Sequence, residues 1–199
     1  MLIDVYDFDG TIYDGDSTFD FCCFCLGRHP VLLTGLPRLL WAGIRLGVGR
    51  IGLTAFKTVL LGIMAKHFDL ETEAEIFWQQ DKTLIKLGAW FKDTPRDLPM
   101  IMASASPEFE LQYPAKILGF ETMLGTRCNT KTGELIGLNC KGEEKLRRIG
   151  QVVGEYEIRA MYTDSVKSDG PLLDVAREGY IIKHGVLSPY EKGHEGEKR

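Results

Sequence analysis

LIDVYDFDGT, at residues 2–11, is the stretch of sequence that decides the fold. Its short apolar run ends at a glycine turn, which predicts a buried β-strand followed by a tight turn. Asp7 and Asp9 leave this strand two residues apart, so in strand geometry they would point the same way. Close like charges are costly unless a cation or a shared proton compensates them. The stretch therefore predicts a strand that delivers two carboxylates to one compensated site.

Further short apolar runs predict the rest of the sheet. Residues 100–103, 159–163 and 180–183 are predicted strands, residues 129–133 the turn of a β-hairpin, and residues 142–153 a helix. Because strands alternate with helices, we expect an α/β fold with a Rossmann-like parallel sheet and right-handed crossovers. Polar clusters follow the strands, where open α/β sheets place their ligand sites.

A largely helical segment separates the first predicted strand from the second. Residues 15–95 interrupt the alternation, so we predict that they form an inserted α-helical cap on a core of residues 1–14 and 96–188. Within this segment, residues 70–92 have the spacing of one long amphipathic helix. Residues 189–199 are charged and contain glycine, which predicts a flexible tail.

Two apolar stripes at helical spacing lie within the predicted cap. One consists of Leu33, Leu36, Leu40 and Ile44, with Trp41 beside it, and the other consists of Phe56, Leu60 and Ile63. Stripes of this kind are typical of helices that pack against a core, so we expect these side chains to form the interior of the cap.

Charge is distributed unevenly along the 199 residues. The net charge is −4, yet there is no Asp or Glu between Phe21 and Phe68. That stretch carries six bases: Arg28, Arg38, Arg45, Arg50, Lys57 and Lys66. A basic, apolar stretch in an acidic protein could face an anionic membrane surface, a phospholipid or a small phosphorylated substrate, whereas no nucleic-acid partner is expected. The bases interrupt each apolar run before it reaches about 18 residues, so no membrane-spanning helix is predicted.

The N-terminus and the cysteines bear on the compartment. Asp4, Asp7 and Asp9 interrupt the region where a secretory signal would have its apolar segment. Five cysteines without framework spacing are typical of reduced thiols. We therefore expect a cytoplasmic protein, with a peripheral position on the inner face of the membrane as the alternative.

Several polar residues after the predicted strands have the chemistry of a phosphoryl-transfer site. Asp7, Asp9 and Asp164 supply hard oxygen ligands suited to Mg²⁺, and a carboxylate can attack phosphorus to form an acyl phosphate. Lys145 could neutralise the nucleophile and the phosphoryl group. Ser104, in a predicted turn at residues 104–107, could donate a hydrogen bond to the phosphoryl oxygens, and the backbone N–H groups of that turn could add more.

Four short motifs, taken in order, resemble those of one enzyme superfamily. DFDGT at residues 7–11 resembles the first motif of the haloacid dehalogenase (HAD) superfamily of aspartate-nucleophile phosphatases, and Ser104 at a strand end resembles the second. CKGEEK, ending at Lys145, is similar to the third, and YTDSVKSD at residues 162–169 to the fourth. The match spans roughly residues 3–183, and four motifs in order are a specific signal.

The resemblance implies a role for each carboxylate. Asp7 would be the nucleophile, and Asp9 the general acid and base that protonates the leaving oxygen and then activates water. Mg²⁺ would be held by Asp7, the main-chain carbonyl of Asp9, and Asp164. Asp169 would support the waters of the metal or the lysine. Asp164 and Asp169 lie five residues apart where close relatives often have four, which leaves the role of Asp169 less defined.

The resemblance also implies a phosphate-binding set. Thr11, Ser104, the backbone at Ala105, and Lys145 would position the phosphoryl group. Lys141 is an alternative to Lys145, although the Gly-x-x-Lys pattern favours Lys145.

The helical insertion resembles the phosphoserine phosphatase-like subgroup. Asp16 lies nine residues after Asp7, where those enzymes carry an acid that contacts substrate, although a helix cap is an equal alternative. Gly10 stands where that subgroup usually has Ser, and Ser104-Ala105-Ser106 replaces its Ser-Gly-Gly. These departures weaken the case for an amino-acid substrate.

A second resemblance is to phosphatidylglycerophosphatases of the C type. Those proteins share the Asp-x-Asp-Gly-Thr start, the acid at position 16, an Arg-x-Pro here at residues 28–30, and the Asp-x-Pro-Leu-Leu here at residues 169–173. The resemblance implies a lipid phosphate, and a basic amphipathic cap could lie on an anionic membrane. A small soluble phosphomonoester remains the favoured substrate. A non-enzymatic, aspartate-phosphorylated signalling module is disfavoured, because receiver domains lack both the long insertion and the acid at Asp9.

Overall fold

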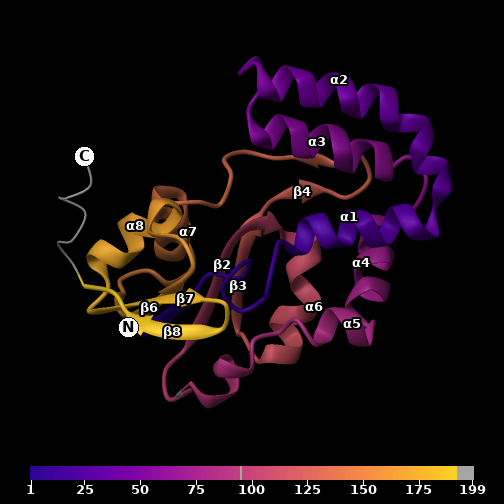
Figure 1. Cartoon of the computed structure of the whole chain (residues 1–199). Coiled ribbons are helices and arrows are strands. Elements are labelled where there is room, and N and C mark those ends of the chain that lie inside the picture. The colour runs from indigo at the N-terminus through magenta and orange to yellow at the C-terminus, as the bar shows by residue number, and fades with distance from the viewer. Residues whose placement is uncertain (95, 192–199) are drawn as a thin grey trace.

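The computed structural model describes residues 1–94 and 96–191, and its centre is a six-stranded sheet in the order β3-β2-β1-β6-β7-β8 (Figure 1). The first five strands in that order run parallel, and β8 is antiparallel to β7. The strands are β1 (Leu2–Tyr6), β2 (Met100–Pro107), β3 (Thr122–Thr126), β6 (Glu157–Thr163), β7 (Glu178–Lys183) and β8 (Val186–Pro189). The predicted α/β fold with a Rossmann-like parallel sheet is confirmed.

Alternating side chains of β1 fill the layers on both faces of the sheet. Ile3 and Val5 join a buried apolar cluster that includes Ile149 and Leu172. These two residues come from α7 (Glu143–Val153) and α8 (Val166–Val175). Tyr6 points to the other face and stacks on Tyr162 of β6, with ring centroids 4.5 Å apart. Both faces of β1 are therefore buried, as expected for the central strand of a parallel sheet.

Helices fill the chain between β1 and β2. They are α1 (Ser17–Arg28), η1 (Pro30–Gly35), α2 (Leu36–Gly47), α3 (Leu53–Met64), α4 (Leu70–Trp78), α5 (Asp81–Leu84) and η2 (Ala89–Asp93). Helices α2 and α3 form a hairpin that stands away from the sheet, whereas α4 and α5 lie beside α6 (Glu108–Leu118) (Figure 1). Trp78 of α4 is fully buried and its Nε1 donates to the carbonyl of Glu110 at 2.7 Å. The later helices thus share a hydrophobic core with the sheet, and a separate cap at residues 15–95 stays a prediction.

The prediction of one long helix at residues 70–92 is wrong. The segment is divided into α4, α5 and η2 because it must bend back onto the loop after β1. There the N–H of Gly88 donates to the carbonyl of Ile12 at 2.6 Å, and Nε1 of Trp90 donates to the carbonyl of Thr11 at 3.1 Å. A straight helix could not make both contacts.

Two strand boundaries also differ from the prediction. β2 continues through residues 104–107, where a turn was expected, because Pro107 pairs with Thr126 of β3 after a register shift. The predicted tail at 189–199 begins too early, since Pro189 belongs to β8 and the N–H of Tyr190 donates to the carbonyl of Gly179 at 2.8 Å. The rest of that tail, from residue 192, lies outside the described residues.

The prediction of a β-hairpin is confirmed, whereas the prediction of a buried apolar stripe is wrong. The predicted hairpin is confirmed as β4 (Cys128–Asn129) paired antiparallel with β5 (Glu134–Leu135). The stripe on α2 was expected inside the cap, yet Leu36, Leu40 and Ile44 are exposed. Helical spacing shows that residues share a face but not which way that face points. Across the described ranges, no helix combines the length and the apolar character needed to cross a bilayer.

Candidate active site

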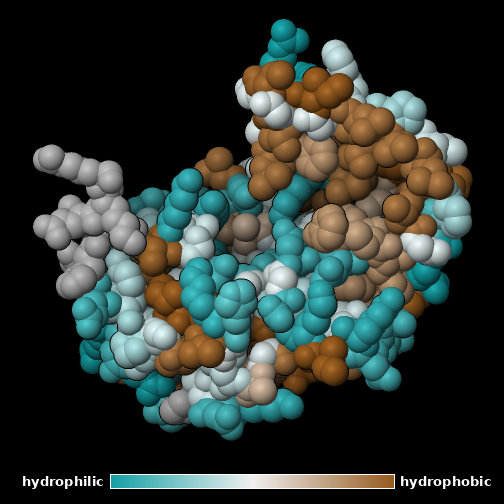
Figure 2. Space-filling view, in the orientation of Figure 1, coloured by the Kyte–Doolittle hydropathy of each residue, from teal (hydrophilic) through white to brown (hydrophobic). Residues whose placement is uncertain are grey.

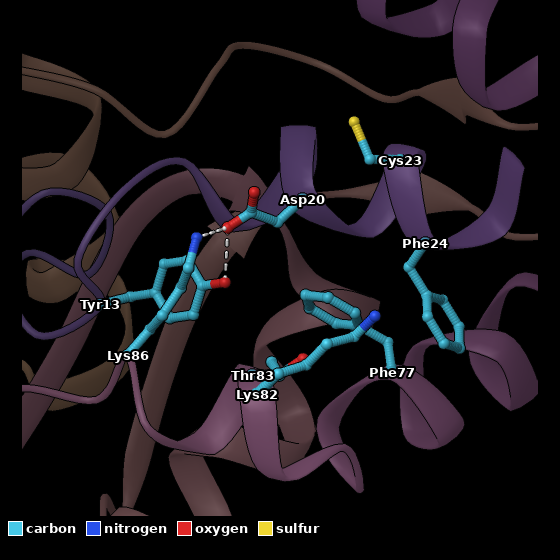
Figure 3. Close-up of a pocket in the computed structure, with 8 residues that line it drawn as sticks. All are labelled: Tyr13, Asp20, Cys23, Phe24, Phe77, Lys82, Thr83 and Lys86. Atoms are coloured by element: carbon cyan, nitrogen blue, oxygen red, sulfur yellow. Dashed lines mark hydrogen bonds and ion pairs between the residues drawn. The ribbon is translucent and has the colours of Figure 1, made fainter. Parts of the chain in front are cut away.

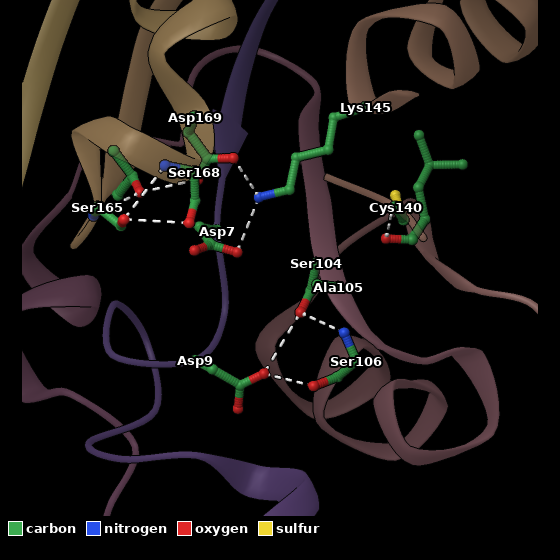
Figure 4. Close-up of polar contacts among 12 residues, drawn as sticks. Asp7, Asp9, Ser104, Ala105, Ser106, Cys140, Lys145, Ser165, Ser168 and Asp169 are labelled. Carbon is green, nitrogen blue, oxygen red and sulfur yellow. Dashed lines mark hydrogen bonds and ion pairs between the residues drawn. The ribbon is translucent and has the colours of Figure 1, made fainter. Parts of the chain in front are cut away.

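Most of the predicted site residues lie at the carboxyl edge of the three central strands, β2, β1 and β6, where Figure 4 shows Asp7, Asp9, Ser104, Lys145 and Asp169. Asp7 directly follows β1, and its N–H donates to the carbonyl of Tyr162 in β6 at 2.9 Å. Ser104 lies in β2, two residues beyond the last residue that pairs with β1, and Asp164 follows β6. Because the strands are parallel, their polar ends converge at one edge of the sheet.

Lys145 bridges two buried carboxylates. Its Nζ lies 2.9 Å from Oδ1 of Asp7 and 2.7 Å from Oδ1 of Asp169. All three side chains are nearly or completely inaccessible to solvent. Thr163 donates its hydroxyl to Oδ2 of Asp169 at 2.8 Å, which fixes that carboxylate from the other side. Lys141, the alternative lysine, is exposed.

Burial dominates the electrostatics of this trio. It raises the pKa of Asp7 to about 7; Lys145 opposes the shift and the charge of Asp169 adds to it. Burial alone would lower the pKa of Lys145, but the negative charges of Asp7 and Asp169 outweigh it, so its pKa is raised. The lysine is therefore a permanent cation beside the predicted nucleophile. Because it contacts Oδ1 of Asp7, Oδ2 is the oxygen left for attack.

Asp9 is held by groups from two other elements. Its Oδ2 accepts hydrogen bonds from Oγ of Ser106 at 2.5 Å and from Oγ of Ser104 at 3.4 Å. Its Oδ1 accepts from the N–H of Ser17, at the first turn of α1, at 2.7 Å. Burial raises the pKa of Asp9, and the hydrogen bonds from Ser106 and Ser17 oppose that shift. A raised pKa favours the protonated form that a general acid needs.

Ser106 is a site residue that the sequence reasoning missed. The predicted turn at residues 104–107 hid it, because in an extended strand residues two apart point to the same side. The strand β2 places Ser104 and Ser106 together in this way, and both hydroxyls reach Asp9. An assignment of residues 104–107 as strand would have found it.

A buried acid lies behind Asp9. The hydroxyl of Thr18 lies 3.1 Å from Oγ of Ser106 and donates to Oε2 of Glu110 at 2.7 Å. Glu110 is fully buried, and this burial raises its pKa to about 8. A line of polar contacts thus runs from Asp9 through the hydroxyls of Ser106 and Thr18 to an acid in α6. Nothing in the sequence distinguishes Glu110 from an exposed helical acid.

The remaining predicted residues have simpler surroundings. Thr11 is buried, and its hydroxyl has no hydrogen-bond partner in the part of the chain that the structure describes. The carbonyl of Ala105 accepts from the hydroxyl of Thr126 at 2.9 Å, which leaves the orientation of that backbone fixed. Asp16 is exposed and caps α1, since its Oδ1 accepts from the N–H of Phe19 at 2.9 Å. The prediction that Asp16 caps a helix is therefore confirmed, whereas its contact with substrate stays a prediction.

The loop after β1 is shaped around Asp164. Gly10 has a φ of +70°, and a Cβ at that position would collide with the Asp164 carboxylate. The carboxylate therefore fills the space left by the missing side chain, beside the backbone of Asp9. Burial raises the pKa of Asp164. Lys183 holds its backbone, because Nζ donates to the carbonyl of Asp164 at 2.5 Å.

This donor set fits Mg²⁺. Within residues 1–94 and 96–191, no three His, Cys, Asp or Glu side chains form a ready-made metal cluster. Lys145 lies between Asp7 and Asp169, and the side chain of Asp9 faces Ser106. The predicted ligands need no such cluster, since Asp9 would offer its main-chain carbonyl beside the carboxylates of Asp7 and Asp164. Buried carboxylates with raised pKa values are groups that a divalent cation would return to the charged form.

A separate pocket lies beside α1 (Figure 3). Its volume is about 300 Å³, and none of the predicted catalytic residues lines it. At one end, Oδ2 of Asp20 accepts from the hydroxyl of Tyr13 at 2.7 Å and from Nζ of Lys86 at 2.5 Å. These contacts join α1 to the loop after β1 and to the segment between α5 and η2, so this part of the pocket supports the position of α1.

The fold and the site together define an α/β protein with an aspartate-based site at the carboxyl edge of a Rossmann-like sheet. A family model for haloacid dehalogenase-like hydrolases matches residues 5–174, and the chain belongs to that family. The superfamily inferred from the four motifs is thereby confirmed.

Individual proteins resemble the chain along most of its length. Protein CicA of Caulobacter vibrioides is 28% identical over 92% of this chain and 87% of its own. A protein of unknown function from Bordetella pertussis Tohama I has a similar structure, with a TM-score of 0.71 and 20% identity over 89% of this chain and 88% of that one. A phosphoserine phosphohydrolase-like protein from Francisella tularensis gives a TM-score of 0.55 with 16% identity, covering 90% and 86%. At these identities the structural matches show the shared fold alone.

Proposed function

We propose that the protein is a Mg²⁺-dependent phosphomonoester hydrolase that acts on a small phosphorylated metabolite through an aspartyl phosphate on Asp7. The observation that carries the proposal is the buried ion pair between Asp7 and Lys145, with a second acid, Asp9, at the same edge of the sheet. Membership of the haloacid dehalogenase-like hydrolases supports it. So does the likeness to a phosphoserine phosphohydrolase-like fold.

The first step forms a bond between Oδ2 of Asp7 and phosphorus while the bond from phosphorus to the leaving oxygen breaks. Lys145 offsets the negative charge of the carboxylate and of the phosphoryl oxygens from a distance of 2.9 Å to Asp7. Asp9, whose pKa is raised by burial, gives its proton to the leaving oxygen. The alcohol product then departs, and the phosphoryl group remains on Asp7.

The second step returns the enzyme to its starting state. Asp9 is now a carboxylate and takes a proton from a water molecule, whose oxygen attacks phosphorus and displaces Asp7. The hydrogen bonds from Ser106 and Ser17 stabilise this charged form of Asp9. Inorganic phosphate leaves, and Asp9 again holds the proton. Thr11, Ser104 and the backbone at Ala105 position the phosphoryl oxygens in both steps.

Mg²⁺ would be held by Asp7, the main-chain carbonyl of Asp9, and Asp164, with Asp169 supporting Lys145. When bound, the ion supplies a fixed positive charge that offsets the charge of the phosphoryl group. The chain's own part is to orient Asp7, Asp9 and Asp164, and burial raises the pKa of all three. Asp169 contributes by fixing the lysine, which it contacts at 2.7 Å.

The test is a phosphate-release panel with and without Mg²⁺. It includes p-nitrophenyl phosphate, phosphoserine, sugar phosphates, nucleotides and phosphatidylglycerophosphate in detergent micelles. We expect turnover that requires Mg²⁺ and falls at least about 1,000-fold in Asp7→Asn. No turnover on any member would overturn the proposal in favour of a binding or signalling role.

A lipid phosphate is the second candidate substrate class. The observation that favours it is an exposed apolar and basic surface on the helices that follow Asp9. A rate on phosphatidylglycerophosphate well above those on the soluble phosphomonoesters would support it. Turnover confined to soluble substrates would exclude it.

A further inference from the structure

The outer face of α2 is apolar although it points away from the rest of the protein. Leu36, Leu40, Ile44 and Val48 follow one another at intervals of four residues and so form one stripe along the helix. Their exposed fractions are 43%, 58%, 59% and 64%. In Figure 2 the hydrophobic colour predominates over the α2–α3 hairpin and the neighbouring side of α1, with paler residues between. We call this stripe, together with Trp41, the α2 outer face.

The fold itself does not need this stripe. The opposite side of α2 already packs inward, where Ala42 is buried and Leu39 contacts the hydrophobic core. Exposed apolar surface is unfavourable in water in proportion to its area. Contiguous apolar patches on a protein surface mark contact with another apolar phase or partner. We therefore expect the α2 outer face to bind another apolar surface.

A groove continues the apolar surface from α2 to α1. It has a volume of about 290 Å³ and lies between α1, η1, α2 and α3, where its walls include Phe19, Leu33, Leu36 and Phe56. Phe19 is 65% exposed at its mouth. A groove of this kind suits an extended hydrocarbon group rather than a polar ligand, because its lining is almost wholly apolar.

The charge around the α2 outer face has a single sign. Arg38 and Arg45 lie seven residues apart, so they project from the same flank of the helix, and Arg50 follows at its end. All three are exposed, and none makes an ion pair within the described part of the chain. Arg28, by contrast, is already neutralised by Glu73 at 2.9 Å. An occupant must therefore be apolar in its interior and negative at its surface.

We propose that the α2 outer face and its groove dock onto an anionic lipid bilayer. Helix α2 would lie in the plane of the interface, with its stripe at the level of the acyl chains and its arginines among the headgroup phosphates. A second copy of this chain fits less well. In a two-fold interface the same patch meets itself, which would bring the unpaired arginines of both copies together.

Docking would place the bilayer close to the candidate active site. Helix α1 joins the two regions, because the N–H of Ser17 donates to Asp9 and Phe19, two residues later, stands at the mouth of the groove. Two helical residues rise by about 3 Å along the axis. The docking surface itself contains none of the residues of the proposed phosphatase chemistry, so the docking proposal does not depend on that chemistry.

Vesicle flotation with the full chain tests the proposal. Vesicles of phosphatidylcholine alone are compared with vesicles that contain phosphatidylglycerol, at low and high salt. We expect binding to the anionic vesicles that weakens with salt. Leu40→Gln/Ile44→Gln should weaken it at least about 10-fold through lost apolar burial, and Arg38→Gln/Arg45→Gln about 30-fold through lost headgroup attraction.

Matched controls separate this surface from others. Ile85→Gln and Val152→Gln change exposed apolar residues on α5's C-terminal side and on α7, and both should bind as the wild type does. Asp7→Asn should also bind normally, which separates docking from catalysis. Failure of the wild type to float with anionic vesicles would overturn the proposal. So would a stable dimer, measured by light scattering, that Leu40→Gln/Ile44→Gln dissolves, because that would assign the face to a second copy.

Discussion

The carboxyl edge of the sheet and the α2 outer face reverse the usual distribution of side chains. At the sheet edge, Asp7, Lys145 and Asp169 are charged yet buried. On α2, Leu40 and Ile44 are apolar yet exposed. Charged groups are normally found at the surface and large apolar groups inside, so each region is unfavourable when the folded chain is considered alone.

The two regions differ in how that cost is offset. The buried charges compensate one another within the chain, since Lys145 lies within 3 Å of both Asp7 and Asp169. The apolar stripe has no such compensation inside the chain. The charges at the sheet edge are therefore balanced within the folded chain, whereas the apolar side chains of the α2 outer face remain in contact with solvent. The proposed chemistry and the proposed membrane docking thus lie in different parts of the molecule.

Lys145→Met should give the largest effect, because it removes the compensation at the sheet edge. Asp7 and Asp169 would be left as buried acids without their cation, and breaking a buried pair costs about 3–5 kcal/mol of unfolding free energy. Activity on p-nitrophenyl phosphate should fall at least about 100-fold. Urea denaturation and steady-state kinetics measure the two losses. Lys141→Met, at an exposed position in the same motif, should change neither; equal stability of the two variants would contradict the ion-pair account.

Glu110→Gln should change how stability depends on pH. Burial raises the pKa of Glu110 from 4.5 to about 8, so between these values the folded chain keeps a proton that the unfolded chain has lost. The free energy of unfolding of the wild type should therefore fall as pH rises, by up to about 1.4 kcal/mol per pH unit from this group. Denaturant titrations at several pH values measure the slope.

Glu110→Gln keeps the shape of the side chain and an oxygen that can accept a hydrogen bond from Thr18. The substitution therefore removes only the titratable carboxyl group. We expect the difference in stability between Glu110→Gln and the wild type to grow from pH 5 to pH 8. Glu121→Gln changes an exposed acid and serves as the control. Parallel pH curves for Glu110→Gln and the wild type would show that Glu110 does not titrate as a buried acid.

Gly10→Ala should separate backbone strain from damage to the site. Gly10 and Gly137 have φ values of +70° and +75°, so alanine at either position should cost about 1–2 kcal/mol. Only at position 10 would the new Cβ meet a neighbour, the carboxylate of Asp164. Gly10→Ala should therefore lose about 100-fold in activity, because Asp164 is displaced. Comparable activity in the two variants would argue against Asp164 as part of the site.

Much of the sheet edge could be predicted because strand ends and motif residues are local patterns. The run before Asp7 gave the central strand, and the Gly-x-x-Lys pattern favoured Lys145, which the structure places against Asp7. Ser106 was missed through one local error, the assignment of β2's end as a turn. Glu110 could not be found at all, since its burial depends on the packing of α1 and α4 against α6.

The α2 outer face shows the opposite limit. The spacing of Leu36, Leu40 and Ile44 correctly grouped them on one face, but the direction of that face depends on how α2 packs on α3 and η1. The pattern predicted that these three side chains are buried in the core, but in the structure they are exposed. The bend of residues 70–92 has the same origin, because contacts with Ile12 and Thr11 override local helical preference.

Leu40→Gln/Ile44→Gln should give the smallest effect on stability, and that small effect is informative. Residues whose side chains are already mostly in water lose little when made polar, so the free energy of unfolding should stay within about 0.5 kcal/mol of the wild type. Leu61→Ala, at a fully buried position on the adjacent helix α3, should cost about 2–5 kcal/mol. Thermal or urea unfolding of both variants measures the contrast. A large loss in the double variant would mean that the α2 outer face is covered within the protein itself, and the distinction between a self-contained site and an open surface would fail.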